Sequence, residues 1–346
     1  MSKFSSLAKK YDNFSIPAYK IICGGAELKR SEFTFTEIYV DNCIGKTAGA
    51  ARFSIADIYE HGSRNFSAKA LKSLTPGTEI SIELGYGSNT TEVFTGYIDE
   101  LIVRYDTEMT LTALCLDARA LMRNGIDFLM HKDKKIQDVV SDILGKYKPL
   151  VSSCEVKLDS LEQDINISQN LQDLDFIIRA GENRGLDFYI DCGKAYLSPP
   201  ANKTCVDFDW EEFTLDFSIR YLDEKITAYG YDSEQMKPFS AMNSYKQKAK
   251  SEKLLTVEKS ERLPHYISSE SAGKYVKAIS DRRIKSAICG TLHCIGLPEI
   301  KLGQNVKINK FPLTALSVPD TLQIIAISHR FDTDTGFKSE ISVEGS

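Results

Sequence analysis

The sequence predicts an α+β fold that is predominantly β, in which two β-rich regions flank an α-rich middle segment. Short runs of alternating apolar residues, separated by turn residues such as Pro76-Gly77, fill the first of these regions. Similar runs return after residue 201, whereas the residues between show helical spacing of their apolar side chains. The predicted organisation is a flexible N-terminal arm (1–17), a first β domain (18–116), an α-rich middle segment (117–200) and a second β domain with a lysine-rich loop and a helix (201–346).

The composition is that of an ordinary soluble globular protein. Apolar residues make up 42% of the 346 residues and charged residues 26%, which is enough apolar material for a sizeable core. The formal charge of −5 argues against general affinity for nucleic acids or anionic membranes. No run approaches the ~20 apolar residues of a membrane-spanning helix, and the N-terminus lacks the apolar core of a signal peptide. We therefore expect a product of the cytoplasm, without nucleic-acid specificity and without membrane insertion of its own.

The eight cysteines are scattered through strand-like sequence and include no CxxC pair. An even number of cysteines would fit disulfide bonds in a small secreted domain, but this chain is large and has no secretory signal. We expect reduced and mostly buried thiols. The eight residues are Cys23, Cys43, Cys115, Cys154, Cys192, Cys205, Cys289 and Cys294.

The first β region contains six strand candidates. In one of them Ile80, Ile82 and Leu84 share a face, as the two-residue period of a strand requires. Short strands at this spacing indicate a small barrel or sandwich. A short helix is expected at Phe66–Leu74, before Pro76. The six strands are expected at Tyr19–Cys23, Glu32–Val40, Ala50–Ala56, Glu79–Tyr86, Glu92–Arg104 and Met109–Leu116.

The middle segment has its best-defined unit at Ser168–Asp191. Leu171, Leu174, Ile178 and Gly181 fall on one helical face. Ser168 is expected to cap the first turn, and Gly185 to end the helix in the left-handed conformation. The strand Leu186–Ile190 and the turn Asp191–Lys194 follow, so we interpret this unit as architecture and not as a reactive site. Two further helices are expected at Asp117–Met122 and Lys135–Tyr147.

The second β region resembles the first in size but includes a charged interruption. Ser240–Ser260 is rich in lysine, and a solvated hairpin or loop explains it better than an anionic-surface site because charge runs usually face water. A serine-capped helix is expected at Ser268–Ser280. Strands are expected at Cys205–Phe208, Phe213–Tyr221, Lys225–Tyr231, Ala287–Ile295, Asn305–Ile308, Thr321–Arg330 and Lys338–Val343.

Two motifs are similar to known ligand-binding motifs, but the residues around each of them do not fit such a site. Gly45-Lys46-Thr47 is similar to the end of a phosphate-binding loop, but position 40 is Val40 where that motif needs glycine, and a strand instead of a helix follows. Cys289, His293 and Cys294 offer three zinc ligands without a fourth, and adjacent residues of a strand point to opposite faces. We predict neither a nucleotide site nor a metal site.

The remaining titratable residues form no recognisable catalytic motif. His61, His131, His265 and His329 have neither metalloprotease spacing nor a neighbouring nucleophile elbow. Acidic residues are plentiful, so sequence leaves a glycosidase-type carboxylate pair open, although no pair stands out. We therefore predict no catalytic, cofactor-binding or metal-binding residue, and we expect a structural or binding protein that is not an enzyme.

Four segments, taken in order, carry a family resemblance. Individually they consist of turns and core positions, but together they cover most of residues 18–345. With these segments the chain resembles the phage late-control gene D proteins, the baseplate hub family that includes the hub portion of type VI secretion VgrG proteins. The segments are Thr75–Gly87 with Val93–Leu101; Leu111–Met122 with the helix at Lys135–Tyr147; Asn170–Leu186; and the helix at Ser268–Ser280 with Gly296–Val306 and Ile325–Gly336.

The resemblance implies a hub-like fold of two small β-barrel domains joined by an α-containing segment. It further implies a homotrimer whose six barrels form a pseudo-sixfold ring between a sixfold tail tube and a threefold spike. The expected partners are the tail tube protein, the spike and other baseplate proteins, in a virion or tail-like particle assembled from bacterial cytoplasm. Because the chain ends at Ser346, just after the second barrel, we expect the spike to be a separate protein. We also expect the barrels' strand edges to close the trimer.

Alternatives from other classes remain open at this point. The particle can be a phage, a tail-like bacteriocin or an extracellular injection system. A cell-wall hydrolase acting during particle entry would need a cleft with paired carboxylates or a nucleophile–histidine pair. A carbohydrate-binding module would need exposed aromatic platforms, whereas Trp210, the only tryptophan, lies between strand candidates where partial burial is expected.

Overall fold

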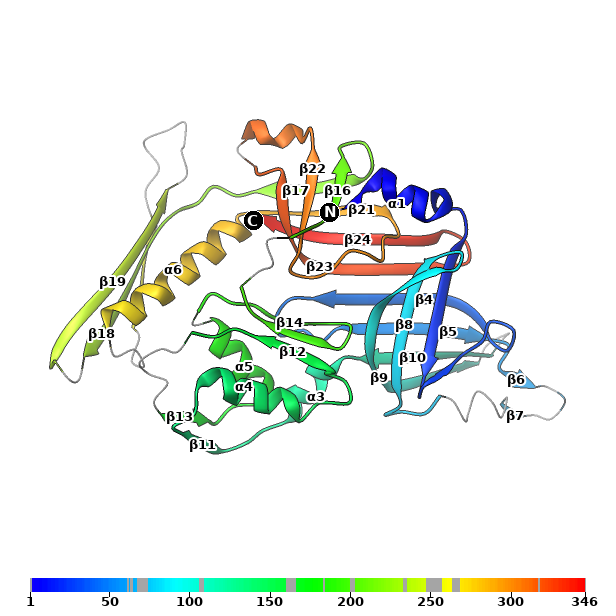
Figure 1. Ribbon diagram of the computed structural model, residues 1–346, viewed down its shortest axis with the longest axis horizontal. Helices are drawn as coiled ribbons and strands as arrows, with labels where there is room; N and C mark the ends of the chain where they lie inside the picture. Colours follow the sequence, from blue (N-terminus) through cyan, green and yellow to red (C-terminus); the bar gives the residue numbers. More distant parts are fainter. Residues whose placement is uncertain are drawn as a thin grey trace.

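A broad sheet, a group of short helices below it and a projecting wing of strands make up the molecule (Figure 1). The structure is a computed structural model. It describes residues 2–60, 62, 65–66, 74–105, 109–159, 166–182, 184–199, 203–232, 235–246, 257–262, 268–316 and 318–345.

The first β unit is antiparallel and buries alternate side chains. Ile80, Ile82 and Leu84 of β8 are each at most 1% exposed, so the two-residue period places one face of this strand in the core. The strands follow the order β4-β5-β10-β9-β8-β2-β3, and the short pair β6 (Tyr59–Glu60) and β7 (Asn65–Phe66) lies apart from them. The seven strands are β2 (Pro17–Cys23), β3 (Ala26–Glu27), β4 (Thr34–Cys43), β5 (Ala50–Ala56), β8 (Glu79–Tyr86), β9 (Asn89–Tyr105) and β10 (Met109–Leu116).

The second β unit is mixed in direction. The strands follow the order β16-β22-β23-β24-β21-β17. The pair β16–β22 is parallel, and the other pairs in this order are antiparallel. The six strands are β16 (Thr204–Asp209), β17 (Thr214–Ile219), β21 (Ile288–Ile295), β22 (Asn305–Asn309), β23 (Thr321–Asp332) and β24 (Gly336–Gly345).

The two β units share one sheet. Residues Ala326–Asp332 of β23 pair antiparallel with Glu37–Cys43 of β4, so the described strands form one sheet of fourteen strands, in which β24, β21 and β17 branch off at β23. Both strands are long and carry alternating apolar residues, and pairing their edges satisfies backbone groups that each unit would otherwise expose. The predicted α+β, predominantly β, hub-like fold is confirmed. The described strands of its two β units join edge to edge and do not close into separate barrels.

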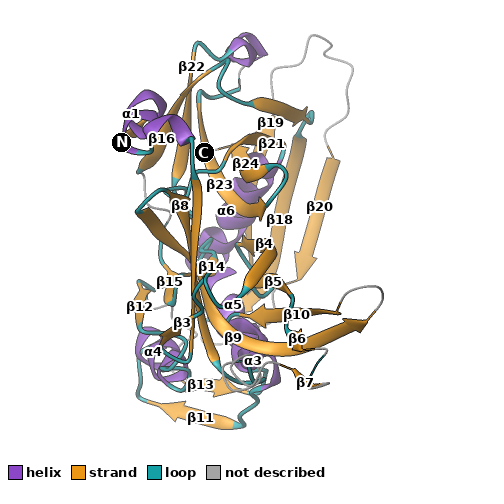
Figure 2. Ribbon diagram, turned by 90° about the vertical axis from the view of Figure 1, so that its right-hand side faces the viewer, coloured by secondary structure: helices purple, strands orange, loops and turns teal. Residues whose placement is uncertain are grey.

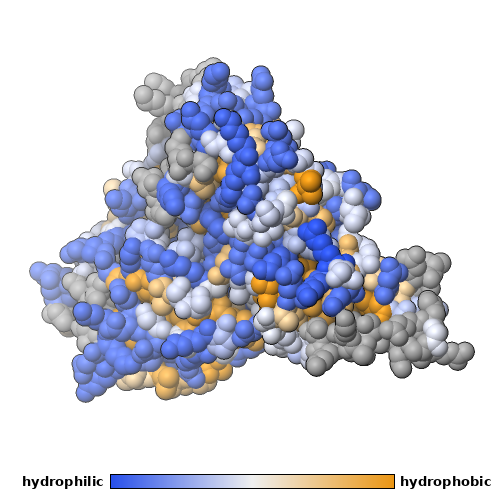
Figure 3. Space-filling view, turned by 45° about the vertical axis from the view of Figure 1, so that its right-hand side comes forward, coloured by the Kyte–Doolittle hydropathy of each residue, from blue (hydrophilic) through white to orange (hydrophobic). Residues whose placement is uncertain are grey.

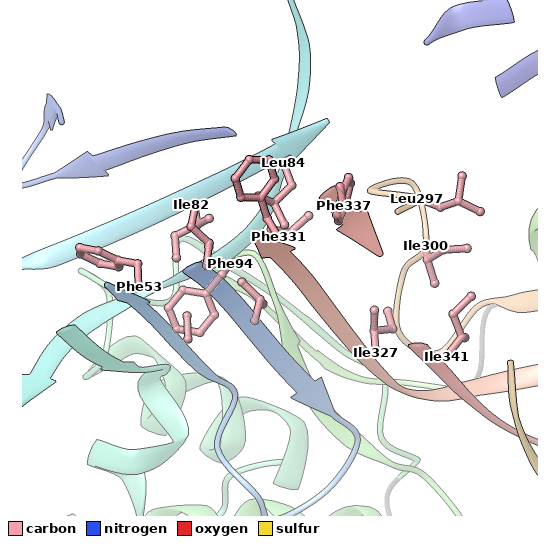
Figure 4. Packing of buried hydrophobic residues seen from close by; sticks show 14 of the residues in the cluster. Phe53, Ile82, Leu84, Phe94, Leu297, Ile300, Ile327, Phe331, Phe337 and Ile341 are labelled. Carbon is pink, nitrogen blue, oxygen red and sulfur yellow. The ribbon is translucent and has the colours of Figure 1, made fainter. Parts of the chain in front are cut away.

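One hydrophobic core runs across the junction of the two β units. Phe53, Ile82 and Leu84 from the first unit share a cluster with residues of the second, as the packing in Figure 4 shows. The ring centroids of Tyr19 and Phe331, one from each unit, lie 4.8 Å apart in an edge-to-face arrangement. The two β units therefore share a single hydrophobic core.

The middle segment packs three helices against short strands. Ile177 and Val140 are fully buried in its separate hydrophobic cluster. Two small sheets, β11–β13 and β12-β15-β14, complete the segment. Most of these strands were not predicted from the sequence, because each is only four residues long. The elements are α3 (Ala118–Asn124), α4 (Ile136–Gly145), α5 (Asp173–Glu182), β11 (Leu129–Lys132), β12 (Ser153–Val156), β13 (Asn166–Gln169), β14 (Phe188–Asp191) and β15 (Lys194–Leu197).

The helix expected from Ser168 begins five residues later. Ser168 belongs to β13 and pairs with Met130, so its predicted capping role is wrong. The strand pairing of the residues before the helix prevailed over the local capping preference. The end of the helix is confirmed, since Gly185 has a φ of +70° and Leu186 donates its backbone N–H to the carbonyl of Gly181 at 3.0 Å.

A wing of three strands and one helix extends to one side of the body (Figures 1 and 2). Its sheet has the order β19-β18-β20, and α6 packs on one face of it. The helix is capped by Ser268 as predicted, but it continues six residues beyond Ser280 because residues 281–286 contain neither glycine nor proline. The wing consists of β18 (Asp223–Asp232), β19 (Lys237–Lys246), β20 (Val257–Arg262) and α6 (Ser269–Ser286).

The N-terminal residues, expected as a flexible arm, are structured and packed. β1 (Ser2–Lys3) pairs in parallel with β16, and α1 (Phe4–Lys10) follows. Leu7 and Tyr11 are buried, and the Tyr11 hydroxyl donates to Glu299 Oε1 at 2.5 Å. The polar composition hid a pattern of aromatic and aliphatic residues that pack on the second β unit. A strand, a helix and buried anchors take the place of the expected arm.

Two further expectations fall partly outside the described residues. Most of the helix expected at Phe66–Leu74 lies outside them, and Phe66 itself is in β7. The lysine-rich stretch Ser240–Ser260 begins in β19 and ends in β20, and its residues 247–256 lie outside them. Within the described residues, no helix combines the length and apolar character needed to cross a membrane.

Candidate functional site

A buried polar cluster joins the first β unit to the middle segment. Arg119 of α3 is 0% exposed, and its guanidinium donates to Asp117 Oδ2 at 2.9 Å, to Asn42 Oδ1 at 2.5 Å and to the Cys43 carbonyl at 2.5 Å. Asp117 also accepts from the backbone N–H of Arg119 at 2.8 Å and so caps α3. The Asn42 amide donates onward to the Ile190 carbonyl at 2.8 Å. The cluster therefore ties β4, α3 and β14 together.

This cluster is built for rigidity. Gly49 donates its N–H to Asp117 Oδ2 at 2.8 Å, and a Cβ at this position would meet the same oxygen at 2.7 Å, so only glycine fits. Every charge is paired and hydrogen-bonded, which is the condition under which a buried ion pair is tolerated. No local pattern in the sequence predicts this cluster, because its residues are separated by up to 148 positions.

A second joint is centred on Lys301, which lies between β21 and β22. Its Nζ donates to the Glu92 carbonyl of β9 at 3.0 Å and lies 3.4 Å from Cys192 Sγ and 3.7 Å from Asp191 Oδ1. Burial acts to lower the pKa of Lys301, but the Asp191 carboxylate and the other partners outweigh it and raise the pKa above its usual value. The lysine stays charged where the two β units and the middle segment meet.

His329 is a buried histidine of the core. Burial, assisted by the nearby positive charge of Lys301, lowers the pKa of His329 to about 3, so the ring is neutral. Its Nδ1 lies 2.8 Å from the hydroxyl of Ser339, and that hydroxyl accepts from the backbone N–H of Leu297 at 2.9 Å. The hydroxyl can therefore donate to Nδ1, and the residue holds β23 and β24 to the loop that follows β21.

The motifs considered for chemistry lie apart from one another. Gly45-Lys46-Thr47 forms the turn between β4 and β5, and Lys46 Nζ pairs with Asp175 Oδ1 at 3.0 Å. His293 is exposed whereas Cys294 is buried, as their strand alternation predicted. His293 lies 3.5 Å from both Asp216 and Glu340 on the solvent face of the sheet. Among the described residues, no three His, Cys, Asp or Glu side chains are arranged to hold a metal ion.

The cysteines are all free thiols, as expected from the sequence. Cys23, Cys115 and Cys294 are buried, Cys154 is exposed and the other four are half-buried. Burial raises the pKa of the Cys23 thiol to about 11 and that of Cys294 to about 12, so neither is a nucleophile at neutral pH.

A groove of about 830 Å³ runs beside the β23–β24 hairpin. Aromatic side chains, among them Tyr39 and Phe213, line it together with Glu211, Glu212 and Glu340. Glu212 Oε2 accepts from the backbone N–H of Asp209 at 2.7 Å, and burial raises the pKa of this carboxyl. Glu212 therefore stabilises the turn between β16 and β17. The groove is where the hydrolase alternative can be tested.

Exposed apolar residues are the feature that distinguishes the surface. On the wing, Tyr229 and Tyr231 of β18 and Met242 of β19 are exposed on the sheet face opposite α6. A further group lies around β11, and a third near the end of β9. Trp210 is 38% exposed, in agreement with the expected partial burial. Alternation of aromatic residues at Tyr229 and Tyr231 was a readable signal for an unpaired sheet face, and the lysine-rich neighbourhood obscured it.

Solved structures define the class of fold. The chain matches a tail protein from Neisseria meningitidis with a TM-score of 0.69 at 12% identity, covering 96% of this chain and 97% of that one. It matches the 43 kDa tail protein of prophage MuSo2 from Shewanella oneidensis with a TM-score of 0.69 at 16% identity, covering 94% and 98%. It also matches a chain of the Francisella PdpA–VgrG complex with a TM-score of 0.58 at 10% identity, covering 96% of this chain and 58% of that one. The protein thus has the fold of phage tail proteins.

A protein-family model also matches most of the chain. The model described as "Alg8 N-terminal domain" matches residues 13–311, and the chain belongs to this family. The description differs from the late-control gene D family that the sequence motifs resemble. A search of curated proteins found no match.

Proposed function

We propose that the protein is a structural baseplate hub of a contractile phage tail or tail-like injection particle. The observation that carries this proposal is the fold shared with tail proteins over almost the whole length of both chains, at a TM-score of 0.69. In this proposal three copies form a ring that joins the tail tube to a central spike. The role is mechanical, and the chain acts without catalysis or a cofactor.

The arrangement of the two β units supports a pseudo-sixfold ring. Three copies with two β units each would place six β units around an axis, although the two units of a copy differ in strand order and direction. Such a ring could match a sixfold tube on one side and a threefold spike on the other. Such a wall must keep its two units at a fixed angle under load. The paired strands β4 and β23, the shared core and the Arg119 and Lys301 joints all resist movement between the units.

The proposal also specifies the domain boundaries of the chain and the partners of the ring. We keep residues 18–116 and 201–346 as the two β domains and 117–200 as the segment that braces them. The partners are the tail tube protein, the spike protein and other baseplate proteins in the assembled particle. The strand edges of β4 and β23 already pair within the chain, so any trimer closure through strand edges would use the remaining ones.

The test is the mass and symmetry of the purified protein. We expect mass photometry and averaged particle images to give a threefold ring, either alone or with its tube and spike partners. A protein that stays monomeric at all concentrations and forms no ring with those partners would contradict the proposal. Hydrolysis of purified peptidoglycan, abolished by Glu212→Gln or Glu340→Gln in the groove, would favour the cell-wall hydrolase instead.

A further inference from the structure

Two exposed apolar patches lie on different parts of the protein. The β11 patch consists of Leu121, Ile126, Phe128, Leu129 and Met130, of which Phe128 is 76% and Met130 72% exposed. The β9 patch lies near the end of the β9–β10 hairpin and consists of Val103 and Tyr105 on one face of the strand, with Tyr105 69% exposed, and of Ile102 on the other face. Isolated exposed apolar residues are ordinary, but groups of exposed apolar residues close together mark interaction surfaces.

The two patches cannot cover each other within one copy. β11 lies at the lower end of the molecule, whereas the β9–β10 hairpin reaches out to one side above it (Figures 1 and 2). In the space-filling view most of the surface is hydrophilic, and apolar atoms gather at a few places that include the lower edge (Figure 3). Two separate patches on one chain are what a head-to-tail contact between copies requires, because such a contact joins unlike surfaces.

The charges beside the patches are complementary. The β11 patch is followed by the exposed Lys132, Lys134 and Lys135 with the exposed Asp133 among them, so this stretch has a net positive charge. Of the three lysines, only Lys134 is in an ion pair within the described part of the chain, with Asp142 at 2.8 Å. The β9 patch is preceded by the exposed Asp99 and Glu100, although Arg104 lies within it. Opposite charges around an apolar centre fix which surfaces meet and in what register.

β11 also has a free backbone edge. It pairs with β13 in a two-stranded sheet, so one of its edges has no described strand partner. An exposed apolar strand of this kind invites association unless another chain covers it. The apolar side chains, the lysines and the open edge of β11 therefore form one surface that is incomplete in a single copy.

We propose that the β11 patch of one copy receives the β9 patch of a neighbouring copy of this chain, and that repetition of this contact closes the ring. The proposal rests on the trimeric hub proposed above and names the surfaces that build it. A stable interface buries on the order of 800 Å² on each partner, so the two patches form the centre of a larger contact. Lys132 and Lys135 face Asp99 and Glu100 across it.

The first experiment separates the two sides of the contact. We expect Met130→Asp and Tyr105→Asp each to weaken self-association by about 30-fold or more, as loss of a central apolar residue does at an interface. The matched control is Met236→Asp, at a residue that is also 72% exposed but lies at the turn between β18 and β19, and it should assemble normally. Circular dichroism checks that all three variants fold.

Mixing the two variants gives the sharper result. Met130→Asp protein keeps an intact β9 patch, and Tyr105→Asp protein keeps an intact β11 patch, so an equimolar mixture should form dimers with one working contact while each variant alone stays monomeric. Trimers from either variant alone, or no dimer in the mixture, would overturn the assignment of these surfaces.

Charge reversal tests the register. Lys132→Glu and Glu100→Lys should each reduce assembly, and the double variant should recover at least part of the loss because the pair is restored with its signs exchanged. No recovery would exclude this pairing. The mass of the wild-type protein distinguishes failure of the proposed trimeric hub from failure of the proposed contact surfaces. A wild type that never forms trimers removes the hub model itself, whereas trimers that all these variants still form remove only the patches.

Discussion

The central body and the wing use very different amounts of core to hold their shape. The body has a continuous cluster of large apolar residues that crosses the β4–β23 junction. Among the described residues, the hydrophobic cluster of the wing has five buried members, three of them alanines: Ile226, Ala228, Ala241, Ala272 and Val276. Since local stability follows the number of buried apolar contacts, the wing should open on its own while the body stays folded. The difference indicates a rigid body and a less stable wing, whose exposed apolar face can be covered by another surface.

The largest effect is expected in the middle segment, which packs like the body. Ile178→Asp places a carboxylate in the buried cluster around α5 and should cost more than about 4 kcal/mol, so that the whole protomer fails to fold. Urea denaturation followed by circular dichroism measures this. The neighbouring Arg179 is exposed, and Arg179→Gln should have little effect. A folded Ile178→Asp protein that fails only in assembly would show that this face of α5 is an interface.

Loss of the Arg119 cluster should come next. Arg119→Met leaves Asp117 and Asn42 buried without their partner, which should cost about 3–5 kcal/mol. Adding Asp117→Asn removes the unpaired charge and should recover part of that stability. The midpoint of urea unfolding of the two variants gives the comparison. Equal stability of both variants would mean that the charge of Asp117 is not the source of the loss.

A smaller and local effect is expected in the wing. Val276→Asp should speed hydrogen exchange of the amides that pair β18 with β19 by about 30-fold, corresponding to ~2 kcal/mol, while exchange in β4 and β23 stays the same. Lys277→Asp, on the exposed side of the same helix, is the control. Equal acceleration in the body would show that the wing and the body unfold as one unit.

An effect comparable to that in the wing, but present only at high pH, is expected at the contact between β24 and the middle segment. Burial, reinforced by Asp187 and opposed by Lys285 and Arg282, raises the pKa of Glu344 to about 7. The folded protein therefore holds this proton more tightly than the unfolded chain does, and the contribution of Glu344 to stability falls as the pH rises from about 4.5 to 7. Glu344→Gln should stabilise the protein by about 1–3 kcal/mol at pH 8 and hardly at pH 5. Thermal unfolding at the two pH values checks this.

The sequence revealed elements whose signals are local. The alternation at Ile80, Ile82 and Leu84, the serine cap of α6 and the glycine end of α5 all depend on neighbours within a few residues. The junction of β4 with β23 pairs residues almost 300 positions apart, and neither strand has a local sequence pattern that identifies the other as its partner. The Arg119 and Lys301 joints were invisible for the same reason. The exposed apolar patches were not predicted, because an apolar residue is assigned to the core when only the sequence is known.

The packing of the N-terminal residues has a consequence for the order of events during synthesis. Lys10 and Tyr11 bond to Glu299 as well as to each other, so this distant partner is missing until nearly 290 further residues have been made. At about 5–20 residues per second, the ribosome needs roughly 15–60 s to supply that partner. The first β unit can begin to form in the meantime, but the first helix waits with its apolar side chains uncovered. The beginning of the chain is thus among the last parts to reach its place.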